Sequence, residues 1–386
     1  MRLTALILVF AIALCGCGGK TQEVAKTPEL RACWVSYLEL NFPDKSKENF
    51  TNEIEKMCGN IKNIGLNCVF VHTISHCDAY YNSNVLPLSK YIAGTRGGKL
   101  DYDPLKIICN TAKKFGLQVH AWINPFRILQ GSADLSQFQD DDIAKKMINS
   151  KDATVLQDGV YLLPTSQNAT RLMLDAIREI VSGYDIDGVH FDDYFYPTTN
   201  ENFDKENYLS YKNSVTNPLS LDDYRRTAVS QFVSAVYRIV KGKDDNLKFG
   251  ISPQADIQKN RNNLYADIEK WCADDGYIDY IMPQIYFGFE CPLDNFKFEN
   301  CLKNWLSIPR HNTEIYVGLG LYRSGEIVEY GAKKSYEWVE NRDIIARQIL
   351  HLRENNISGF SIFSYSSFEK FPADTENICN LLKGTD

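Results

Sequence analysis

The sequence predicts an α/β protein folded as one (β/α)8 TIM barrel, and three observations lead to this prediction. Short apolar runs alternate with amphipathic segments, which is the pattern of βα units on a parallel sheet. Eight segments of each kind follow one another along the chain. No shift in composition marks a second domain. The long connections 73–103, 124–167 and 195–219 all follow expected strands, so we expect them at the C-terminal face, with the first of them as a cleft wall.

The elements follow in order from their apolar patterns and their end signals. The expected strands are 31–36, 67–72, 118–123, 188–194, 248–252, 280–286, 314–319 and 359–365. The expected helices are 47–64, 104–115, 168–182, 220–240, 265–275, 295–306, 341–354 and 374–383. Glycines just past periodic apolar runs mark four helix ends. These glycines are Gly65, Gly116, Gly183 and Gly242.

The N-terminal segment has the pattern of a lipoprotein signal peptide. Arg2 precedes an apolar run over residues 3–14, which is too short to span a bilayer. The run ends in Leu14-Cys-Gly-Cys17, which resembles a bacterial lipobox. We therefore expect residues 1–16 to be removed, Cys17 to be lipidated, 17–28 to form a polar tether and 29–386 to form the barrel. The protein would then be a membrane-anchored lipoprotein of the cell envelope. An ordinary secretory signal cut elsewhere is the alternative.

The composition is that of a globular protein and argues against one class of partner. Of the 386 residues, 44% are hydrophobic and 24% are charged, as in ordinary globular domains. The formal net charge is −7 and no basic block offsets it, which argues against binding to nucleic acid. Nine of the 11 cysteines lie beyond Cys17 and no CxxC pair occurs. We expect most of them to be buried free thiols and not a disulfide framework.

Residues 185–197, DIDGVHFDDYFYP, carry the strongest indication of function. Side chains alternate between the two faces of a strand, so His190, Asp192 and Tyr194 would share one face. In a parallel barrel, the C-terminal end of a strand is where active sites lie. Carboxylates flanked by aromatic rings are typical of sugar chemistry, because rings stack on pyranose faces and carboxyl groups transfer protons or attack. The alternative is an aspartate pair that caps the next helix or holds a loop.

The same alternation places polar side chains of five strands on one inward face. Buried polar groups each need a hydrogen-bond partner, so this convergence favours a polar ligand over a purely structural network. Trp122, Tyr194 and Tyr286 share the face and are expected to be sugar platforms. The converging polar residues are His72, His120, Asn124, His190, Asp192, Ser252, Gln284 and Tyr286.

Longer motifs carry a resemblance to a known family. The motifs are Arg31-Ala-Cys-Trp34-Val, Asp78-Ala-Tyr80-Tyr-Asn-Ser83, Tyr102-Asp-Pro-Leu105, His120-Ala-Trp-Ile-Asn-Pro-Phe-Arg127, Asp187-Gly-Val-His-Phe-Asp-Asp193, Ser252-Pro253 and Pro283-Gln-Ile-Tyr286. From about Arg31 to its end, the chain resembles the glycosyl hydrolase-like 10 family. The resemblance implies a glycosidase-like barrel on a secreted or lipid-anchored protein. It also implies a cell-envelope or extracellular polysaccharide as substrate, with peptidoglycan glycan strands as one candidate. Asp78, Tyr80 and Arg127 of these motifs join the expected substrate-binding residues.

A more distant likeness is to the chitinase-type barrels, whose fourth strand ends Asp-Gly-x-Asp-x-Asp-x-Glu. Asp187 and Asp192 match this pattern, but His190 replaces the first inner Asp and Tyr194 replaces the catalytic Glu. The proton donor of that family is therefore missing here, and an acid would have to come from elsewhere.

Glycoside hydrolysis requires two carboxyl groups, one on each side of the scissile bond. We expect Asp192 to be the nucleophile or base, and Asp193 to orient Arg127 or a sugar hydroxyl. The two residues are adjacent, so they could form the catalytic pair only if the strand ends before them. Glu290 after the sixth strand is the first candidate for the acid, followed by Glu39 and Asp256.

Two other classes of protein remain open. A metal-dependent polysaccharide deacetylase could hold zinc through His72, His76, Asp78, His120 and His190, although no HxH or HExxH motif is present. A glycan-binding lipoprotein that has lost catalysis is the other. The glycoside hydrolase is preferred, with no metal and no cofactor expected.

Overall fold

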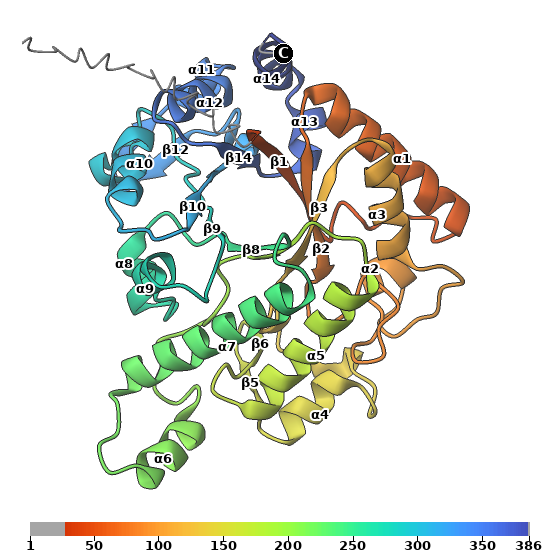
Figure 1. The fold of residues 1–386 in the computed structure, drawn as a ribbon, viewed down its shortest axis with the longest axis vertical. Coiled ribbons are helices and arrows are strands. Elements are labelled where there is room, and N and C mark those ends of the chain that lie inside the picture. Colours follow the sequence, from red (N-terminus) through yellow and green to blue (C-terminus); the bar gives the residue numbers. More distant parts are fainter. Residues whose placement is uncertain (1–27, 385–386) are drawn as a thin grey trace, which may run out of the picture.

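The computed structural model describes residues 28–384, which form a barrel of parallel strands surrounded by helices (Figure 1). The expected lipidation site Cys17, the signal peptide and most of the tether lie outside the described residues. None of the helices within residues 28–384 has the length and apolar character needed to cross a membrane.

The barrel strands fall where the apolar runs predicted them, with shifted ends. They are β1 Leu30–Val35, β2 Cys68–Ile74, β3 Gln118–Ile123, β7 Gly188–Phe191, β8 Lys248–Ile251, β9 Tyr280–Ile281, β10 Glu314–Ile315, β11 Val317–Leu319 and β14 Gly359–Ile362. The fourth expected strand is the important difference, because β7 ends at Phe191 and leaves both Asp192 and Asp193 beyond it.

The sheet closes on itself through one interrupted strand. Its neighbours run β10-β9-β8-β7-β3-β2-β1-β14-β11, and every pairing in this sheet is parallel. Only Tyr316 separates β10 from β11, so the two ends of this order belong to one stretch of chain. That stretch pairs with β9 on one side and β14 on the other. Counting β10 and β11 as one interrupted strand, the barrel has eight strands, which confirms the predicted (β/α)8 fold.

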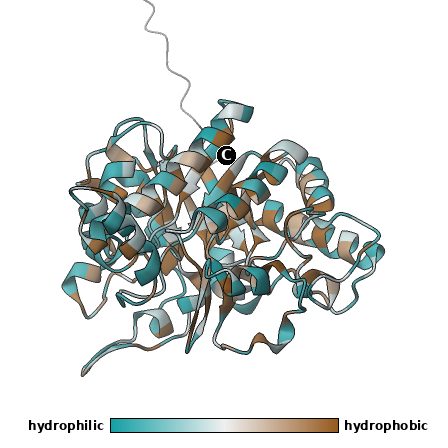
Figure 2. Cartoon of the chain, turned by 90° about the horizontal axis from the view of Figure 1, so that it is seen from below, coloured by the Kyte–Doolittle hydropathy of each residue, from teal (hydrophilic) through white to brown (hydrophobic). Residues whose placement is uncertain are grey.

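The eight expected helices are all present. They are α1 Lys47–Ile64, α3 Pro104–Lys114, α5 Gln167–Gly183, α7 Leu221–Lys243, α9 Ile268–Ala273, α10 Phe298–Leu306, α12 Ile344–Glu354 and α14 Pro372–Lys383. Side-chain caps begin several of them; Ser46, for example, accepts the backbone N–H of Asn49. Figure 2 shows hydrophobic and hydrophilic residues alternating along the helices, as expected when one side of each helix faces the sheet.

The four glycine stop signals lie at or next to helix ends, as predicted. Gly65 ends α1 with φ 101° and donates its N–H to the carbonyls of Ile61 and Lys62. Gly116 also has a positive φ of 66°. Gly183 is the last residue of α5 and Gly242 the last but one of α7, so these helices also end at the predicted glycines, but neither glycine has a positive φ.

The long connections contain elements that the sequence pattern did not reveal. Residues 124–167 form an antiparallel sheet of β4 Arg127–Gln130, β6 Gly159–Leu162 and β5 Ala153–Leu156, together with α4 Ile143–Asn149. The connection after β7 holds α6 Lys205–Ser214. β4 matters for the site because it begins with Arg127.

The core has two layers, as a barrel requires. A large cluster lies between the sheet and the helices. A smaller cluster fills the barrel interior with Leu30, Ala32, Trp34, Cys68, Phe70, Trp122, Tyr280, Met282 and Tyr316. The nine cysteines beyond Cys17 are all free; eight are buried and Cys379 is partly buried, which confirms the expected free thiols.

Candidate active site

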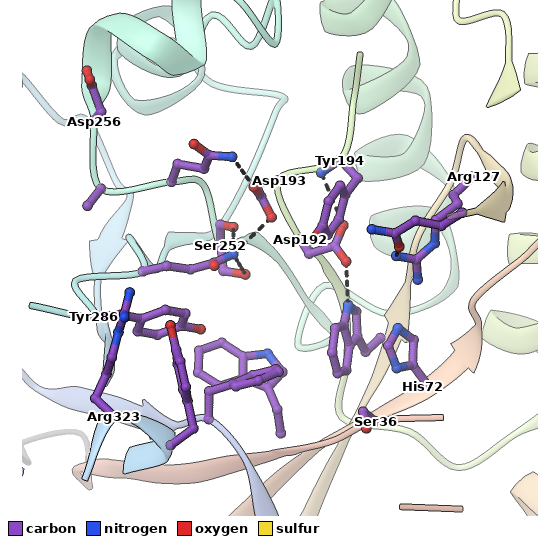
Figure 3. Close-up of a pocket in the computed structure, with 18 of the residues that line it drawn as sticks. Ser36, His72, Arg127, Asp192, Asp193, Tyr194, Ser252, Asp256, Tyr286 and Arg323 are labelled. Atoms are coloured by element: carbon purple, nitrogen blue, oxygen red, sulfur yellow. Dashed lines mark hydrogen bonds between the residues drawn. The ribbon is translucent and has the colours of Figure 1, made fainter. Parts of the chain in front are cut away.

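A cleft of about 790 Å³ opens at the C-terminal ends of the barrel strands (Figure 3). Segments that follow β1, β3, β7, β8, β9, β11 and β14 supply its walls. Its lining residues include aromatic rings, namely Trp34, Tyr37, Trp122, Tyr194, Tyr286, Phe287, Phe296, Tyr322 and Phe363. Three carboxyl groups line it as well, namely Asp192, Asp193 and Asp256.

Asp192 is the most strongly perturbed carboxyl group of the cleft. Its Oδ2 accepts hydrogen bonds from Trp122 Nε1 at 3.2 Å and Asn124 Nδ2 at 3.1 Å, and its Oδ1 accepts the backbone N–H of Tyr194 at 3.3 Å. Burial, with the neighbouring charge of Asp193, raises the pKa of Asp192 to about 7. Asp192 is therefore a carboxyl group that keeps its proton close to neutral pH.

Asp193 lies in the same cleft because β7 ends before it. Its Oδ2 accepts Gln254 Nε2 at 2.7 Å and its Oδ1 accepts Gln284 Nε2 at 3.2 Å. Burial raises its pKa too. The condition under which the two aspartates could act together is thus met. Asp193 hydrogen-bonds to these two glutamines and not to Arg127, so the expectation that it orients Arg127 was wrong, while the alternative that it orients a sugar hydroxyl stays a prediction.

Trp122 and His72 form a stacked pair beside Asp192. Their ring centroids lie 3.4 Å apart with an angle of 21° between the planes. His72 Nδ1 accepts the backbone N–H of Tyr37, so its proton is on Nε2, which is buried and has no partner. Burial and the charge of Arg127 lower the pKa of His72 well below its usual value. The neutral imidazole therefore has one buried N–H group without a partner behind the cleft wall.

Arg127 lies on the same side of Asp192 as His72 (Figure 3). Its Nε donates to the carbonyl of Ser75 at 3.1 Å and its Nη1 to Gln130 Oε1 at 2.7 Å. Its guanidinium carbon lies 5.2 Å from the centroid of the Tyr194 ring. Arg127 is thus a positive charge held in a fixed position at one end of the cleft.

Three of the expected ligand-binding residues lie below the cleft floor instead of lining it. Asn124 reaches the cleft only through Asp192. His190 is fully buried, with Nε2 beside Trp34 Nε1 and Ser252 Oγ and Nδ1 beside the hydroxyl of Tyr280. His120 lies deeper still and opens to a separate pocket at the N-terminal ends of the strands.

Asp78 and Tyr80 lie behind the cleft wall. Both side chains bond to Ser75 Oγ, at 3.1 Å and 3.0 Å. No residue of the connection 73–103 lines the cleft, so the expectation that it forms a wall was wrong. The connection contributes to the cleft indirectly, because the carbonyl of its Ser75 accepts a hydrogen bond from Arg127 Nε.

The three acid candidates have different surroundings. Glu290 is exposed outside the cleft, since Glu337 of the segment Glu337–Glu340 binds its backbone N–H and that of Phe289. Glu39 accepts the hydroxyl of Ser364 and pins a loop. Asp256 lines the cleft while capping the helix Ile257–Asn262. Only Asp256 of these three therefore faces the cleft, and Glu290 does not.

Several cleft residues were missed by the sequence analysis. Gln254 holds Asp193, and continuing the alternation past Ser252 would have placed it on the inward face. Trp34 follows in the same way from Ala32. The segments after β11 and β14 contribute Tyr322, Arg323 and Phe363, and the sequence shows no polar pattern there.

The histidines of the metal hypothesis do not converge. Within residues 28–384, no group of three or more His, Cys, Asp or Glu side chains is arranged to hold a metal ion. His72 stacks on Trp122, His76 bonds Ser75, and His120 bonds the hydroxyl of Tyr280. The ligand set proposed for zinc is therefore spread over three separate environments.

Comparison with known proteins bears on this architecture. YngK, a glycosyl hydrolase of Bacillus subtilis strain 168, is 30% identical over 372 residues, covering 89% of this chain and 69% of YngK. DigH, a glycosyl hydrolase of Escherichia coli K12, is 27% identical over 378 residues, covering 84% of each chain. Among solved structures, the glycoside hydrolase domain of PgaB (BpsB) from Bordetella bronchiseptica superposes with a TM-score of 0.62 at 12% identity. That superposition covers 92% of this chain and 99% of the domain.

The likeness to PgaB supports the barrel fold, while the sequence relatives bear on the family. The expected enzyme class, glycoside hydrolase, is confirmed by the family and these relatives. The sequence profile of glycosyl hydrolase-like 10 matches residues 29–339. The chain therefore belongs to the glycosyl hydrolase-like 10 family, as its motifs predicted.

Proposed function

We propose that the protein hydrolyses O-glycosidic bonds in a cell-envelope or extracellular polysaccharide, with Asp192 and Asp193 as the catalytic carboxyl groups. One observation carries the proposal. Both aspartates are buried side by side at the C-terminal end of β7, in a cleft lined with aromatic rings. Rings of this kind bind sugar faces, and a pair of carboxyl groups supplies the acid and the base or nucleophile.

The raised pKa of Asp192 assigns the catalytic roles of the two carboxyl groups. Because the pKa of Asp192 is raised to about 7, this carboxyl group is protonated when a leaving oxygen needs a proton. Asp192 is therefore the general acid in this proposal, and not the nucleophile or base that the sequence suggested. Asp193, held by two amide donors, is the second carboxylate. Asp256 is the remaining cleft carboxyl group and the alternative for that second role.

Leaving-group dependence and chemical rescue separate these roles. Asp192→Asn should lose most turnover on a polysaccharide but little on an aryl glycoside whose leaving group needs no proton. Asp193→Asn should recover turnover when azide is added, because azide replaces a missing nucleophile or base. Rescue of Asp256→Asn in place of Asp193→Asn would transfer the second role to Asp256. Equal loss in Asp192→Asn on both substrates would contradict the acid role.

The substrate can be identified by a product screen. Peptide-free peptidoglycan strands, chitosan and plant or host polysaccharides should be incubated with the full chain and the products resolved by mass. Release of shorter oligosaccharides from one class supports hydrolysis. Tight binding without any product would instead support the glycan-binding lipoprotein, and loss of acetyl groups without chain cleavage would support the deacetylase.

Membrane anchoring through Cys17 is part of this proposal, supported by the Leu14-Cys-Gly-Cys17 sequence. Cys17→Ser should block lipid attachment and move the protein from the membrane fraction to the soluble extracytoplasmic fraction. The matched variant Cys15→Ser should leave the fractionation unchanged. Membrane association of Cys17→Ser with processing at the original site would contradict the lipobox.

A further inference from the structure

Three arginine side chains of the described chain are almost fully withdrawn from water, and they differ in what compensates their charge. Arg225 is 0% exposed and its Nε donates to Asp204 at 3.0 Å. Arg96 is 8% exposed and its Nε donates to Asp142 at 2.7 Å. Both guanidinium groups thus have a carboxylate in contact, which is the usual condition for a buried charge.

Arg127 is 5% exposed and lacks such a partner. Its two protein acceptors, the carbonyl of Ser75 and the amide oxygen of Gln130, are both neutral. Within residues 28–384, no carboxylate forms an ion pair with it. Asp192 shares the cleft, and the charge of Arg127 offsets part of the rise in the pKa of Asp192, yet this carboxyl group hydrogen-bonds to Trp122 and Asn124 instead.

Arg127 lines the cleft, and one nitrogen of its guanidinium group has no acceptor within residues 28–384. The guanidinium carbon lies 5.8 Å from the ring centroid of Tyr37 and 5.2 Å from that of Tyr194, so two aromatic rings hold it. Nε and Nη1 are bonded, whereas Nη2 has no acceptor among the described residues. His72, whose Nε2 is also without a partner, lies close by on the same side of Asp192 (Figure 3). Arg127 Nη2 is therefore the unused donor at this end of the cleft, since His72 Nε2 is itself buried.

We propose that the cleft binds an acidic glycan, and that a carboxylate on one of its sugars pairs with Arg127. This inference rests on the proposed function, since it names the substrate class of the same cleft. A carboxylate is the group that a guanidinium edge recognises best, with charge-assisted bonds whose geometry is fixed. The sugar carboxylate would supply the counter-ion that Asp142 and Asp204 supply to the other two arginines.

Two common sources of a sugar carboxylate are the lactyl ether of muramic acid and the C6 position of uronic acids. Binding should therefore be measured by calorimetry with a peptide-free peptidoglycan tetrasaccharide and with a hyaluronan tetrasaccharide. Each is paired with its carboxyl-reduced counterpart, which keeps the sugars and removes the charge. All arms use the full chain in an Asp192→Asn background, so that no ligand is cleaved.

The expected result is that at least one acidic tetrasaccharide binds about 10- to 100-fold more tightly than its reduced form. Arg127→Gln should abolish this preference while leaving the affinity for the reduced form unchanged. Arg127→Lys, which keeps the charge but lacks the fork, should retain a smaller preference. The ligand that shows the preference identifies the source of the carboxylate.

Arg323→Gln is the matched control. Arg323 also lines the cleft, but it is paired with Glu326, so its loss should leave the ratio of acidic to reduced affinity unchanged. Equal binding of acidic and reduced forms by the parent protein would overturn the inference and leave the proposed function intact. A preference that survives in Arg127→Gln would also overturn it. Failure to bind any of the four ligands would overturn both this inference and the proposed glycan cleft.

If Arg127→Gln does not fold, Arg127→Lys and the parent protein decide the matter. The parent's acidic-to-reduced ratio must exceed one, and Arg127→Lys must lower it. A ratio that Arg127→Lys leaves unchanged would count against Arg127 as the binding group.

Discussion

The two ends of the barrel interior contain similar side chains in different states. At the C-terminal end, the cleft holds Asp192 with a raised pKa, an unpartnered His72 Nε2 and an arginine without a carboxylate. At the N-terminal end, a pocket of about 630 Å³ is lined by His120, Tyr280, Asp187, Glu314 and Tyr316. There, the polar groups satisfy one another or the backbone.

The pairing at the N-terminal end is explicit. Tyr280 Oη lies 3.0 Å from both His120 Nδ1 and His190 Nδ1, and Asp187 accepts the backbone N–H of Val119 at 2.8 Å. Tyr316 donates to Glu314. Among residues 28–384, no buried polar atom without a partner belongs to a residue that lines this pocket. The two ends therefore differ in that residues lining the cleft include polar atoms without a partner, His72 Nε2 and Arg323 Nε, whereas the described residues lining the N-terminal pocket do not.

The largest expected effect is a difference in kcat between variants of two aspartates that flank β7. Asp192 follows the C-terminal end of β7 and Asp187 precedes its N-terminal end. Asp192→Asn should lower kcat on a polysaccharide by about 10³-fold, because an amide cannot donate the required proton. Asp187→Asn should leave kcat unchanged, since its carboxyl group only accepts a backbone N–H. Comparable losses of kcat in the two variants would contradict the functional difference between the C-terminal and N-terminal ends of the barrel.

An intermediate effect should appear in stability and not in turnover. Tyr280→Phe removes the hydroxyl group that bonds both His120 and His190, so two buried imidazoles each lose a partner. The free energy of unfolding should fall by about 1–3 kcal/mol, measured by denaturant titration. kcat should stay near that of the parent. A large loss of kcat with unchanged stability would show that this network takes part in catalysis.

The smallest expected effect is a change in the pH profile. Trp122 Nε1 donates to Asp192 Oδ2, and this bond lowers the pKa of Asp192 because it stabilises the charged form. Trp122→Phe removes the donor, so the pKa of Asp192 should rise. For a general acid, activity is lost as pH rises through the pKa, so the alkaline limb of kcat/KM should move to higher pH. Movement of that limb to lower pH would contradict the assigned role.

Much of this architecture was predictable from residue patterns, because barrel strands and helices have regular periods. The eight apolar runs correspond to the eight strands of the barrel. Strand alternation also placed four cleft residues correctly on the inward face, namely His72, Asp192, Gln284 and Tyr286. What alternation alone does not give is depth. His120 lies two residues before Trp122 on β3, which places it about 6–7 Å lower along the strand. Counting from the strand end would have assigned His120 and His190 to the interior.

Other features depend on contacts distant in sequence, and strand and helix periodicity gave no signal for them. Glu290 follows a strand, as an active-site acid would, but Glu337 binds the backbone of its loop and the side chain turns away. Arg127 reaches the cleft because β4 pairs with β6 inside a long connection. The extent of β7 was overestimated, since the expected strand was continued through Asp192 and Asp193 to Tyr194 while ladder pairing stops at Phe191.

The protonation of Asp192 can be measured directly. Protein labelled with ¹³C at the aspartate carboxyl carbons should be titrated by NMR, with the Asp192 signal assigned as the one absent from Asp192→Asn. Titration of that signal with a midpoint of about 7 is the result that the structure predicts. A midpoint below 5 would mean that Asp192 is ionised at neutral pH, which would contradict its role as the general acid.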